Sequence, residues 1–204
     1  ERIELNARND YGETAFMIAC QKGHKDVVQL LLNHANSNLD TNARDNFGCT
    51  PFLAACEYGH KDVVQLLLDH SDPTVELNVR ASDGVTALMM ACGEGHKDVV
   101  QLLLKHSDLI DLNARCNLDL TVLMWACING HKDVVQLLLD NSERIDLNAR
   151  TNIDGITAYM FACRFGRKDV VQLLLNHSNP RIEVNAKANT DFQTYCETCR
   201  REEN

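Results

Sequence analysis

The stretch Gly-His-Lys-Asp-Val-Val-Gln-Leu-Leu-Leu at residues 23–32 decides the fold, because the chain contains it five times. It returns unchanged at residues 59–68, 95–104 and 130–139, and at residues 166–175 with arginine in place of the histidine. The steps between copies are 36, 36, 35 and 36 residues. A fixed period of roughly 20–50 residues is the signature of an architecture in which each copy is one small structural unit.

Two further features keep the same period. A threonine opens an apolar run in every copy, at Thr14, Thr50, Thr86, Thr121 and Thr157. Asn-Ala-Arg, or a close variant of it, starts at Asn6, Asn42, Asn78, Asn113, Asn148 and Asn185. Three features that share one period over five copies establish a tandem repeat.

The first copy has the pattern of two short helices joined by a tight turn. We expect the side chain of Thr14 to cap the first helix by accepting a hydrogen bond from a free backbone N–H group. Gly23 ends this helix, because glycine adopts the left-handed conformation at little cost. Asp26 falls in the first turn of the second helix, where the helix dipole favours a negative charge. One such pair cannot enclose all its valines and leucines, so equivalent pairs are expected to stack side by side.

Polar, turn-rich segments separate the copies, as in Asn-Asp-Tyr-Gly at residues 9–12. The glycine suits a turn position with positive φ. Asp119 replaces this glycine in the fourth copy, and aspartate is among the few side chains that tolerate the conformation. The fifth copy has one extra residue between Arg150 and Thr157.

These residues resemble the ankyrin repeat, whose pattern residues 50–60 (Thr-Pro-Phe-Leu-Ala-Ala-Cys-Glu-Tyr-Gly-His) and 63–68 (Val-Val-Gln-Leu-Leu-Leu) follow closely. The resemblance implies an all-α solenoid of L-shaped units, with finger turns at right angles to the helices and a concave groove floored by the first helices. We predict one domain over residues 1–204 with five full repeats and a partial sixth. The predicted repeats span residues 3–36, 39–72, 75–108, 110–143, 145–179 and 182–204.

The chain begins inside a repeat, since residues 1–8 nearly duplicate residues 143–150 without the helix that precedes the latter. We therefore expect a fragment of a longer array. The first repeat has no polar cap, which leaves a face suited to end-to-end contacts, although a monomer is the expected state.

Bulk composition excludes several classes of function. The formal charge of −9 over 204 residues is wrong for a general nucleic-acid binder, which needs a basic face. No segment has the roughly 18–20 apolar residues of a membrane helix. Nine cysteines, an odd count spread at about one per repeat, favour reduced thiols in a cytoplasmic or nuclear protein. Cys49 and Cys116 fall in fingers, where we expect exposure.

No cofactor, metal or catalytic site is predicted. Cys196 and Cys199 have the spacing of half a zinc site, but a structural zinc normally takes four ligands and no second pair lies nearby. The histidines follow the repeat, so they are expected to stabilise turns or helix ends. An active site would require a base beside a nucleophile that breaks the pattern.

Residues that vary between copies are the candidates for recognition, because the constant ones are fixed by stacking. By the geometry of the family, most of them face the groove or the finger tips. The predicted partner-binding side chains are Tyr11, Phe47, Tyr58, Met90, Leu118, Trp125, Ile128, Phe161 and Phe165. Large aromatic side chains of this kind dominate interface energies. For Trp125 and Phe161, filling gaps between repeats remains the alternative.

A row of arginines occupies one position in each finger: Arg8, Arg44, Arg80, Arg115 and Arg150. In the family this position commonly faces the partner, which would then carry an acidic or phosphorylated stretch. The alternative is that each arginine pairs with a nearby carboxylate such as Asp10 or Asp45.

The predicted function is non-catalytic binding of another protein or peptide through the concave groove and the finger tips. Two alternatives remain open. The repeats could regulate a larger enzyme or membrane channel of which they are a segment, or they could act as a spacer without a specific ligand.

Overall fold

A computed structural model describes residues 4–34, 38–70, 75–106, 108–177 and 182–184 of the chain. The described part contains ten α-helices in five consecutive pairs, and β-structure only as isolated bridges within fingers. The first helices of the pairs are α1 (Ala15–Gln21), α3 (Pro51–Glu57), α5 (Ala87–Glu94), α7 (Val122–Asn129) and α9 (Ala158–Arg164). The second helices are α2 (Lys25–Asn33), α4 (Lys61–Asp69), α6 (Lys97–Lys105), α8 (Lys132–Asp140) and α10 (Lys168–Asn176).

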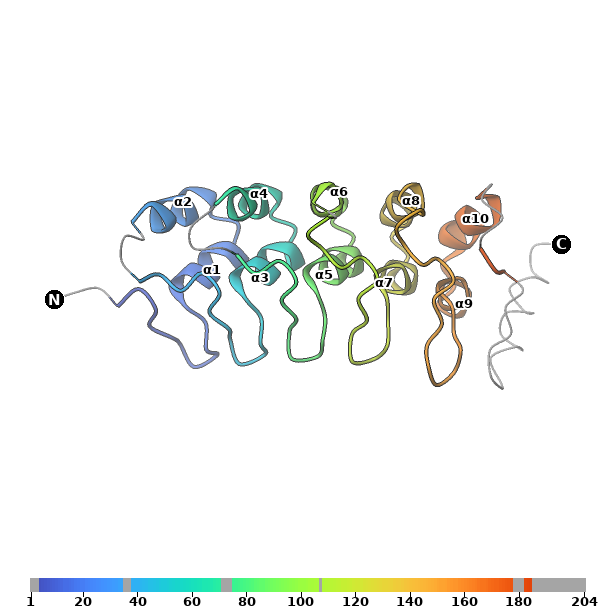
Figure 1. Ribbon diagram of the computed structural model, residues 1–204, viewed down its shortest axis with the longest axis horizontal. Coiled ribbons are helices and arrows are strands. Elements are labelled where there is room, and N and C mark those ends of the chain that lie inside the picture. Colours follow the sequence, from blue (N-terminus) through green and yellow to red (C-terminus); the bar gives the residue numbers. More distant parts are fainter. Residues whose placement is uncertain (1–3, 35–37, 71–74, 107, 178–181, 185–204) are drawn as a thin grey trace. The chain divides into compact units, whose positions relative to one another are not determined.

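The chain forms two compact units. The first comprises residues 1–91 and 98–111, and the second comprises residues 92–97 and 112–204. In the first unit, α1 packs against α3 and α2 against α4, while each helix also contacts its own partner. In the second unit, α7 packs against α9 and α8 against α10 in the same way. Within each unit the first helices form one row and the second helices another, and the fingers extend from the first-helix row (Figure 1).

Threonine caps begin the first helices, as the sequence predicts. The side-chain oxygen of Thr14 accepts from the backbone N–H of Met17 at 3.2 Å, and Thr50 accepts from Leu53 at 3.3 Å. Thr86, Thr121 and Thr157 do the same in the other copies. At the far end of α1, Gly23 has φ of +71°, the predicted left-handed conformation. The same local signals therefore set the bounds of each first helix.

Stacking, rather than the helix pair itself, buries the second helices. Val27 on α2 is 45% exposed, whereas Val63 and Val99 at the same position of the next two copies are 1% and 0% exposed. The local sequence is identical, so the difference comes from the preceding pair, since α2 packs against α4. Removing such a side chain from water stabilises the fold by about 1.5–3 kcal/mol. The side-by-side stacking of equivalent pairs that the sequence predicts is present in this unit.

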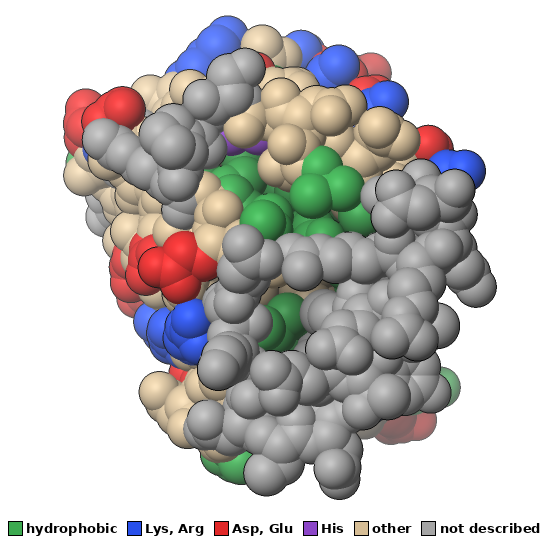
Figure 2. Space-filling model, turned by 90° about the vertical axis from the view of Figure 1, so that its right-hand side faces the viewer, with side chains coloured by type: hydrophobic (Ala, Val, Ile, Leu, Met, Phe, Trp, Pro, Cys, Tyr) green, Lys and Arg blue, Asp and Glu red, His purple; other side chains and the backbone are tan. Residues whose placement is uncertain are grey.

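The side of the second unit that carries α9 and α10 also shows apolar surface. Figure 2 views the chain from this side, and described hydrophobic side chains gather in one area with charged ones toward its edge. Phe165 and Leu175, from this pair of helices, are 45% and 40% exposed.

The repeat-phased cysteines are packing residues. Cys20, Cys56, Cys92, Cys127 and Cys163 are buried free thiols. Burial raises the pKa of Cys20 to about 12 and raises the pKa of Cys56 further still. The prediction of exposed finger cysteines is wrong for Cys116, which is 6% exposed in a finger closed by the hydrogen bond from its backbone N–H to the carbonyl of Leu120, while Cys49 is half-buried.

Candidate partner-binding groove

Each finger is a minimal hairpin whose geometry comes from a few polar side chains. In the second finger, Asp45 Oδ1 accepts from the backbone N–H groups of Phe47 and Cys49, both at 2.8 Å. Asn9 performs the same task in the first finger. Gly48, with φ of +75°, then reverses the chain. This places Phe47 at the tip, with 70% of its side chain exposed.

Neighbouring fingers of the first unit are hydrogen-bonded at their tips. The backbone N–H of Asn46 donates to the carbonyl oxygen of Tyr11 at 3.0 Å, and that of Ser82 donates to the carbonyl of Phe47 at 2.9 Å. The backbone of the tips is therefore occupied, and the side chains remain available outward. Recognition at this edge has to use side chains.

The arginine row joins consecutive fingers. Nη1 of Arg44 donates to the carbonyl oxygen of Arg80 at 2.8 Å, and Arg8 donates to the carbonyl of Arg44. In the second unit, Nη1 of Arg115 reaches the carbonyl of Arg150 at 2.8 Å. Neither of the two alternatives stated above, a partner-facing row or pairing with nearby carboxylates, describes these hydrogen bonds. Their acceptors are backbone carbonyls of the next finger.

Two arginines of the row also pair with a carboxylate, as the second alternative predicts, although not with Asp10 or Asp45. Arg115 lies 2.9 Å from Asp119, and Arg150 lies 3.1 Å from Glu183. These contacts give the arginines a structural role between fingers, and an acidic partner stays a prediction.

The ends of the first helices are fixed by a second kind of contact. His60 Nε2 lies 2.8 Å from the carbonyl oxygen of Gln21, one repeat earlier. His131 makes the same contact to Gly93 in the second unit, and Nε of Arg167 donates to Ile128 at 2.8 Å. Arginine thus replaces histidine in the fifth copy without loss of the hydrogen bond. His60 and His131 thus stabilise their turns, as predicted.

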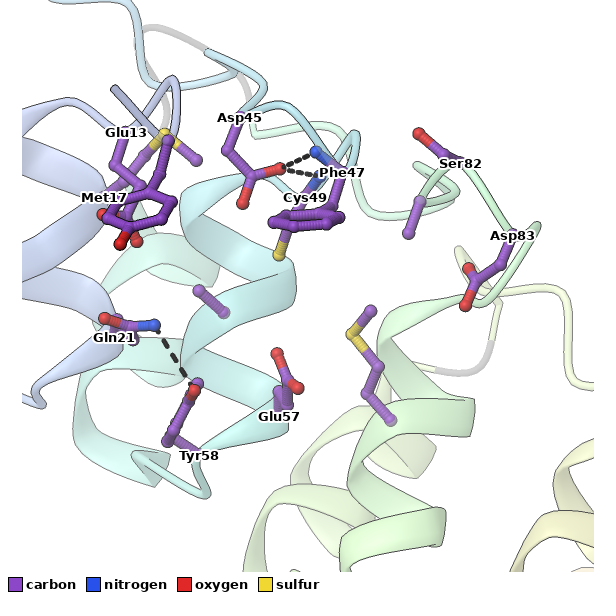
Figure 3. Close-up of a pocket in the computed structure, with 14 residues that line it drawn as sticks. Glu13, Met17, Gln21, Asp45, Phe47, Cys49, Glu57, Tyr58, Ser82 and Asp83 are labelled. Atoms are coloured by element: carbon purple, nitrogen blue, oxygen red, sulfur yellow. Dashed lines mark hydrogen bonds between the residues drawn. The ribbon is translucent and has the colours of Figure 1, made fainter. Parts of the chain in front are cut away.

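Between these two sets of contacts, the first unit encloses a groove of about 580 Å³. Its volume lies in the range of roughly 300–1,000 Å³ typical of ligand sites. Fingers form one side, and residues of α1, α3 and α5 form the other (Figure 3). The lining residues are Tyr11, Glu13, Met17, Gln21, Asp45, Phe47, Cys49, Ala54, Glu57, Tyr58, Ala81, Ser82, Asp83 and Met90.

Aromatic side chains stand at both edges of this fingertip groove. Tyr11 and Phe47 are 66% and 70% exposed on the fingers, and Tyr58 is 48% exposed at the end of α3. The hydroxyl of Tyr58 accepts from Nε2 of Gln21 at 3.4 Å, and the two side chains point toward each other in Figure 3. Met17 is almost fully buried and forms part of the floor. The groove therefore has an apolar floor and amphipathic edges.

Carboxylates give the fingertip groove a negative field. Glu13, Asp45, Glu57 and Asp83 line it, and among the described lining residues there is no lysine or arginine. The thiol of Cys49 lies among them and senses this charge. Burial is the main cause that raises the pKa of Cys49 to about 12, and Asp45, Glu57, Asp83 and Glu13 each raise it as well.

The structure brings four of the predicted partner-binding residues to one place. Tyr11, Phe47, Tyr58 and Met90 all line the fingertip groove. Their joint position follows from the repeat, because the tips of consecutive fingers and the ends of consecutive first helices fall into register.

In the second unit the predicted partner-binding residues differ in how exposed they are. Leu118 is 71% exposed at a finger tip and Phe165 is 45% exposed, whereas Trp125 and Ile128 are half-buried. Phe161 is only 8% exposed and stacks against Phe165, with ring centroids 6.4 Å apart. For Phe161 the gap-filling alternative describes its position, because stacking against Phe165 leaves little of the ring accessible.

Trp125 also fills a gap. A Cβ on Gly93 would lie 3.1 Å from the indole ring, so the small residue in one copy accommodates the large one in the next. The indole N–H is buried, with no hydrogen-bond partner among the described residues.

Residue-by-residue prediction missed the acidic lining of the fingertip groove. One signal for it was present, since Asp83 occupies the tip position where the other fingers carry Tyr11, Phe47, Leu118 and Ile153. The other carboxylates are turn or helix-end residues, whose convergence on Cys49 depends on the stacking.

Comparison with protein families agrees with this architecture. A family model described as ankyrin repeats (3 copies) matches residues 1–76, 73–151 and 108–188. The chain belongs to the ankyrin repeat family. Its fold is accordingly an all-α repeat solenoid, and ankyrin repeats are in general protein–protein interaction modules. A comparison with curated protein sequences finds no match.

The described part of the chain has neither a membrane-spanning helix nor a metal-binding cluster. None of the described helices combines the length and apolar character that a bilayer crossing requires. Among the described residues there is no group of three or more His, Cys, Asp or Glu side chains placed to hold a metal ion. Cys196 and Cys199 lie outside the described residues.

Proposed function

We propose that this ankyrin array binds a partner protein, without catalysis, through the fingertip groove of its first unit. The observation that carries the proposal is the convergence of exposed Tyr11, Phe47 and Tyr58 around one groove. Aromatic side chains bury large areas at low entropic cost and are the commonest anchors of protein interfaces.

The polar groups around the groove support binding rather than chemistry. Asp45 accepts from two backbone N–H groups of its own finger, and His60 contacts the carbonyl of Gln21. These groups already make hydrogen bonds that hold the fingers and helices in place. A rigid scaffold with free aromatic edges is suited to recognition, because little conformational entropy is lost on binding.

Photo-crosslinking tests the proposal directly. A benzophenone amino acid introduced at position 47 should capture a partner in cells, and the same group at position 30 should not. Leu30 is the matched control because it is an apolar residue, 67% exposed, that lies on α2 outside the groove.

Binding measurements with the captured partner complete the test. The double variant Phe47→Ala/Tyr58→Ala should weaken the dissociation constant by roughly tenfold or more, as expected for exposed anchors, while Leu30→Ala should not. Circular dichroism should be unchanged in both, since all three side chains are substantially exposed. Equal capture from positions 30 and 47, or unchanged affinity of the double variant, would favour a spacer or another binding face.

A further inference from the structure

We propose that the segment bound in the fingertip groove is basic, with lysine or arginine side chains on either side of a large apolar residue. This proposal rests on the function proposed above and adds the chemistry of the partner. It reverses the expectation of an acidic partner that the arginine row raised.

The apolar part of the ligand is specified by the floor and edges of the groove. Met17, Ala54 and Met90 form an unbranched or small lining between the aromatic edges. Methionine is flexible and polarisable, and it adapts to aliphatic side chains of different shape. A leucine, isoleucine or methionine of the partner fits such a surface.

The charged part is specified by where the carboxylates lie. Glu13 and Asp45 belong to the first two fingers, Asp83 to the tip of the third, and Glu57 to the end of α3. They therefore border the groove on the finger side and on the helix side, as Figure 3 shows for the labelled residues. Charges of one sign around a concave surface focus their field into it, which favours a ligand of opposite charge.

The cationic groups of the same fingers are held at the backbone instead of lining the groove. Nη1 of Arg8 lies between two backbone carbonyls of its own and the next finger, and Nη1 of Arg44 does the same. These arginines do not line the groove. The same four carboxylates lie close enough to Cys49 at the groove wall to raise the pKa of its thiol, in addition to burial, which is the main cause.

The chain supplies its own conservative substitutions for a test. Asn9 occupies in the first finger the place that Asp45 has in the second, and it accepts the same two kinds of hydrogen bond. Gln21 occupies the position of Glu57 in the first repeat. An asparagine at position 83 can likewise still accept from the backbone N–H of Val85. The variant Asp45→Asn/Glu57→Gln/Asp83→Asn should therefore fold normally and remove three charges from the groove. The matched control, Asp26→Asn/Asp62→Asn/Glu76→Gln, removes three exposed carboxylates that do not line the groove.

A random dodecapeptide library displayed on phage is the probe. Selected on the unsubstituted chain, it should become enriched in peptides with two or more lysines or arginines next to a large apolar residue. One such peptide, synthesised with a fluorophore, should bind the groove variant roughly tenfold more weakly, because three modest charge contacts together have that effect, and the control variant nearly unchanged.

The outcomes separate this proposal from the proposed function. Selected peptides that are neutral or acidic, or a basic peptide that binds the groove variant and the unsubstituted chain equally, would overturn the basic ligand. If Phe47→Ala/Tyr58→Ala still abolished binding in that case, the groove would remain the binding site. Failure of this aromatic variant to affect any selected peptide would instead overturn the groove as the site.

Discussion

His60 Nε2 lies 2.8 Å from the carbonyl oxygen of Gln21, a residue 39 positions earlier in the chain. A carbonyl oxygen only accepts, so Nε2 carries the proton and donates. The contact ties the turn of one repeat to the end of the first helix in the preceding repeat. It thereby holds Gln21 and Tyr58 together at one edge of the fingertip groove.

Removal of this hydrogen bond should destabilise the first unit. His60→Ala leaves the carbonyl of Gln21 without its partner, which costs about 1–2 kcal/mol in the free energy of unfolding. His24→Ala is the control, since His24 occupies the same position in the first copy and is exposed. Urea titration followed by circular dichroism measures both. Equal effects of the two substitutions would mean that the hydrogen bond contributes little.

Substitution of two turn glycines distinguishes the cost of backbone strain from the cost of a clash with the next repeat. Gly23 and Gly166 have φ of +71° and +63°, but a Cβ on Gly23 would overlap the ring of His60, whereas a Cβ on Gly166 would meet nothing within 4 Å. Gly166→Ala should cost only the strain of the left-handed conformation, about 1–2 kcal/mol. Gly23→Ala should cost clearly more, because the imidazole must move. If urea unfolding shows the same loss for both, the close approach of His60 is not a constraint on the fold.

Asp119 combines a strained backbone with two anchored oxygens. Its φ is +62°, Oδ1 lies 2.9 Å from Nη1 of Arg115, and Oδ2 accepts from the backbone N–H of Asn152. Asp119→Ala keeps the strain and loses both contacts, so it should destabilise the chain by about 2 kcal/mol. Asp119→Gly loses the contacts but relieves the strain, and it should be more stable than the alanine variant by about 1 kcal/mol. Thermal unfolding compares them, and the opposite order would contradict this description.

The buried thiols predict a loss of stability at alkaline pH. Burial raises the pKa of Cys20 from 9.0 to about 12, and the pKa of Cys56 is raised in the same direction. Above pH 9 the unfolded chain releases protons that the folded chain keeps. The stabilisation is therefore complete below pH 9 and declines as pH rises toward the folded pKa, by about 1.4 kcal/mol per pH unit for each thiol.

Urea unfolding between pH 8 and pH 10.5, in the presence of a reductant, tests this linkage. Cys56→Ala should lower stability at pH 8 through lost packing, yet its stability should fall less steeply with pH than that of the unsubstituted chain. Identical slopes would exclude Cys56 as a source of the effect.

The repeat and the helices and turns within it could be predicted from the sequence alone. Thr14, Gly23 and Asp119 act locally, so their roles as cap, helix terminator and left-handed turn residue could be predicted from neighbouring residues alone. The family resemblance placed Tyr11, Phe47, Tyr58 and Met90 toward a groove, and the structure places them there.

The partners of long polar side chains could not be predicted in this way. Arg44 has an aspartate next to it in the sequence, yet it donates to a carbonyl 36 positions later, because stacking brings the next finger closer than the local turn allows the carboxylate to come. The acidic lining could not be predicted for the same reason. Asp45 and Asp83 are a full repeat apart in the sequence, yet stacking brings both close enough to raise the pKa of Cys49.

Cys49 allows the negative field of the fingertip groove to be measured without a ligand. Two methanethiosulfonate reagents of similar size, one cationic and one anionic, can be compared by mass spectrometry of the peptide that contains Cys49. Each rate is normalised to the rate with a small free thiol. A negative potential concentrates the cation and repels the anion, and the difference decreases as salt screens the charges.

The cationic reagent should modify Cys49 roughly tenfold faster than the anionic one at low ionic strength, as expected for a focused local field. The preference should largely disappear in Asp45→Asn/Glu57→Gln/Asp83→Asn and persist in Asp26→Asn/Asp62→Asn/Glu76→Gln. Equal rates for the two reagents in the unsubstituted chain, or a preference for the anion, would contradict the claim that this groove is built to receive a basic partner.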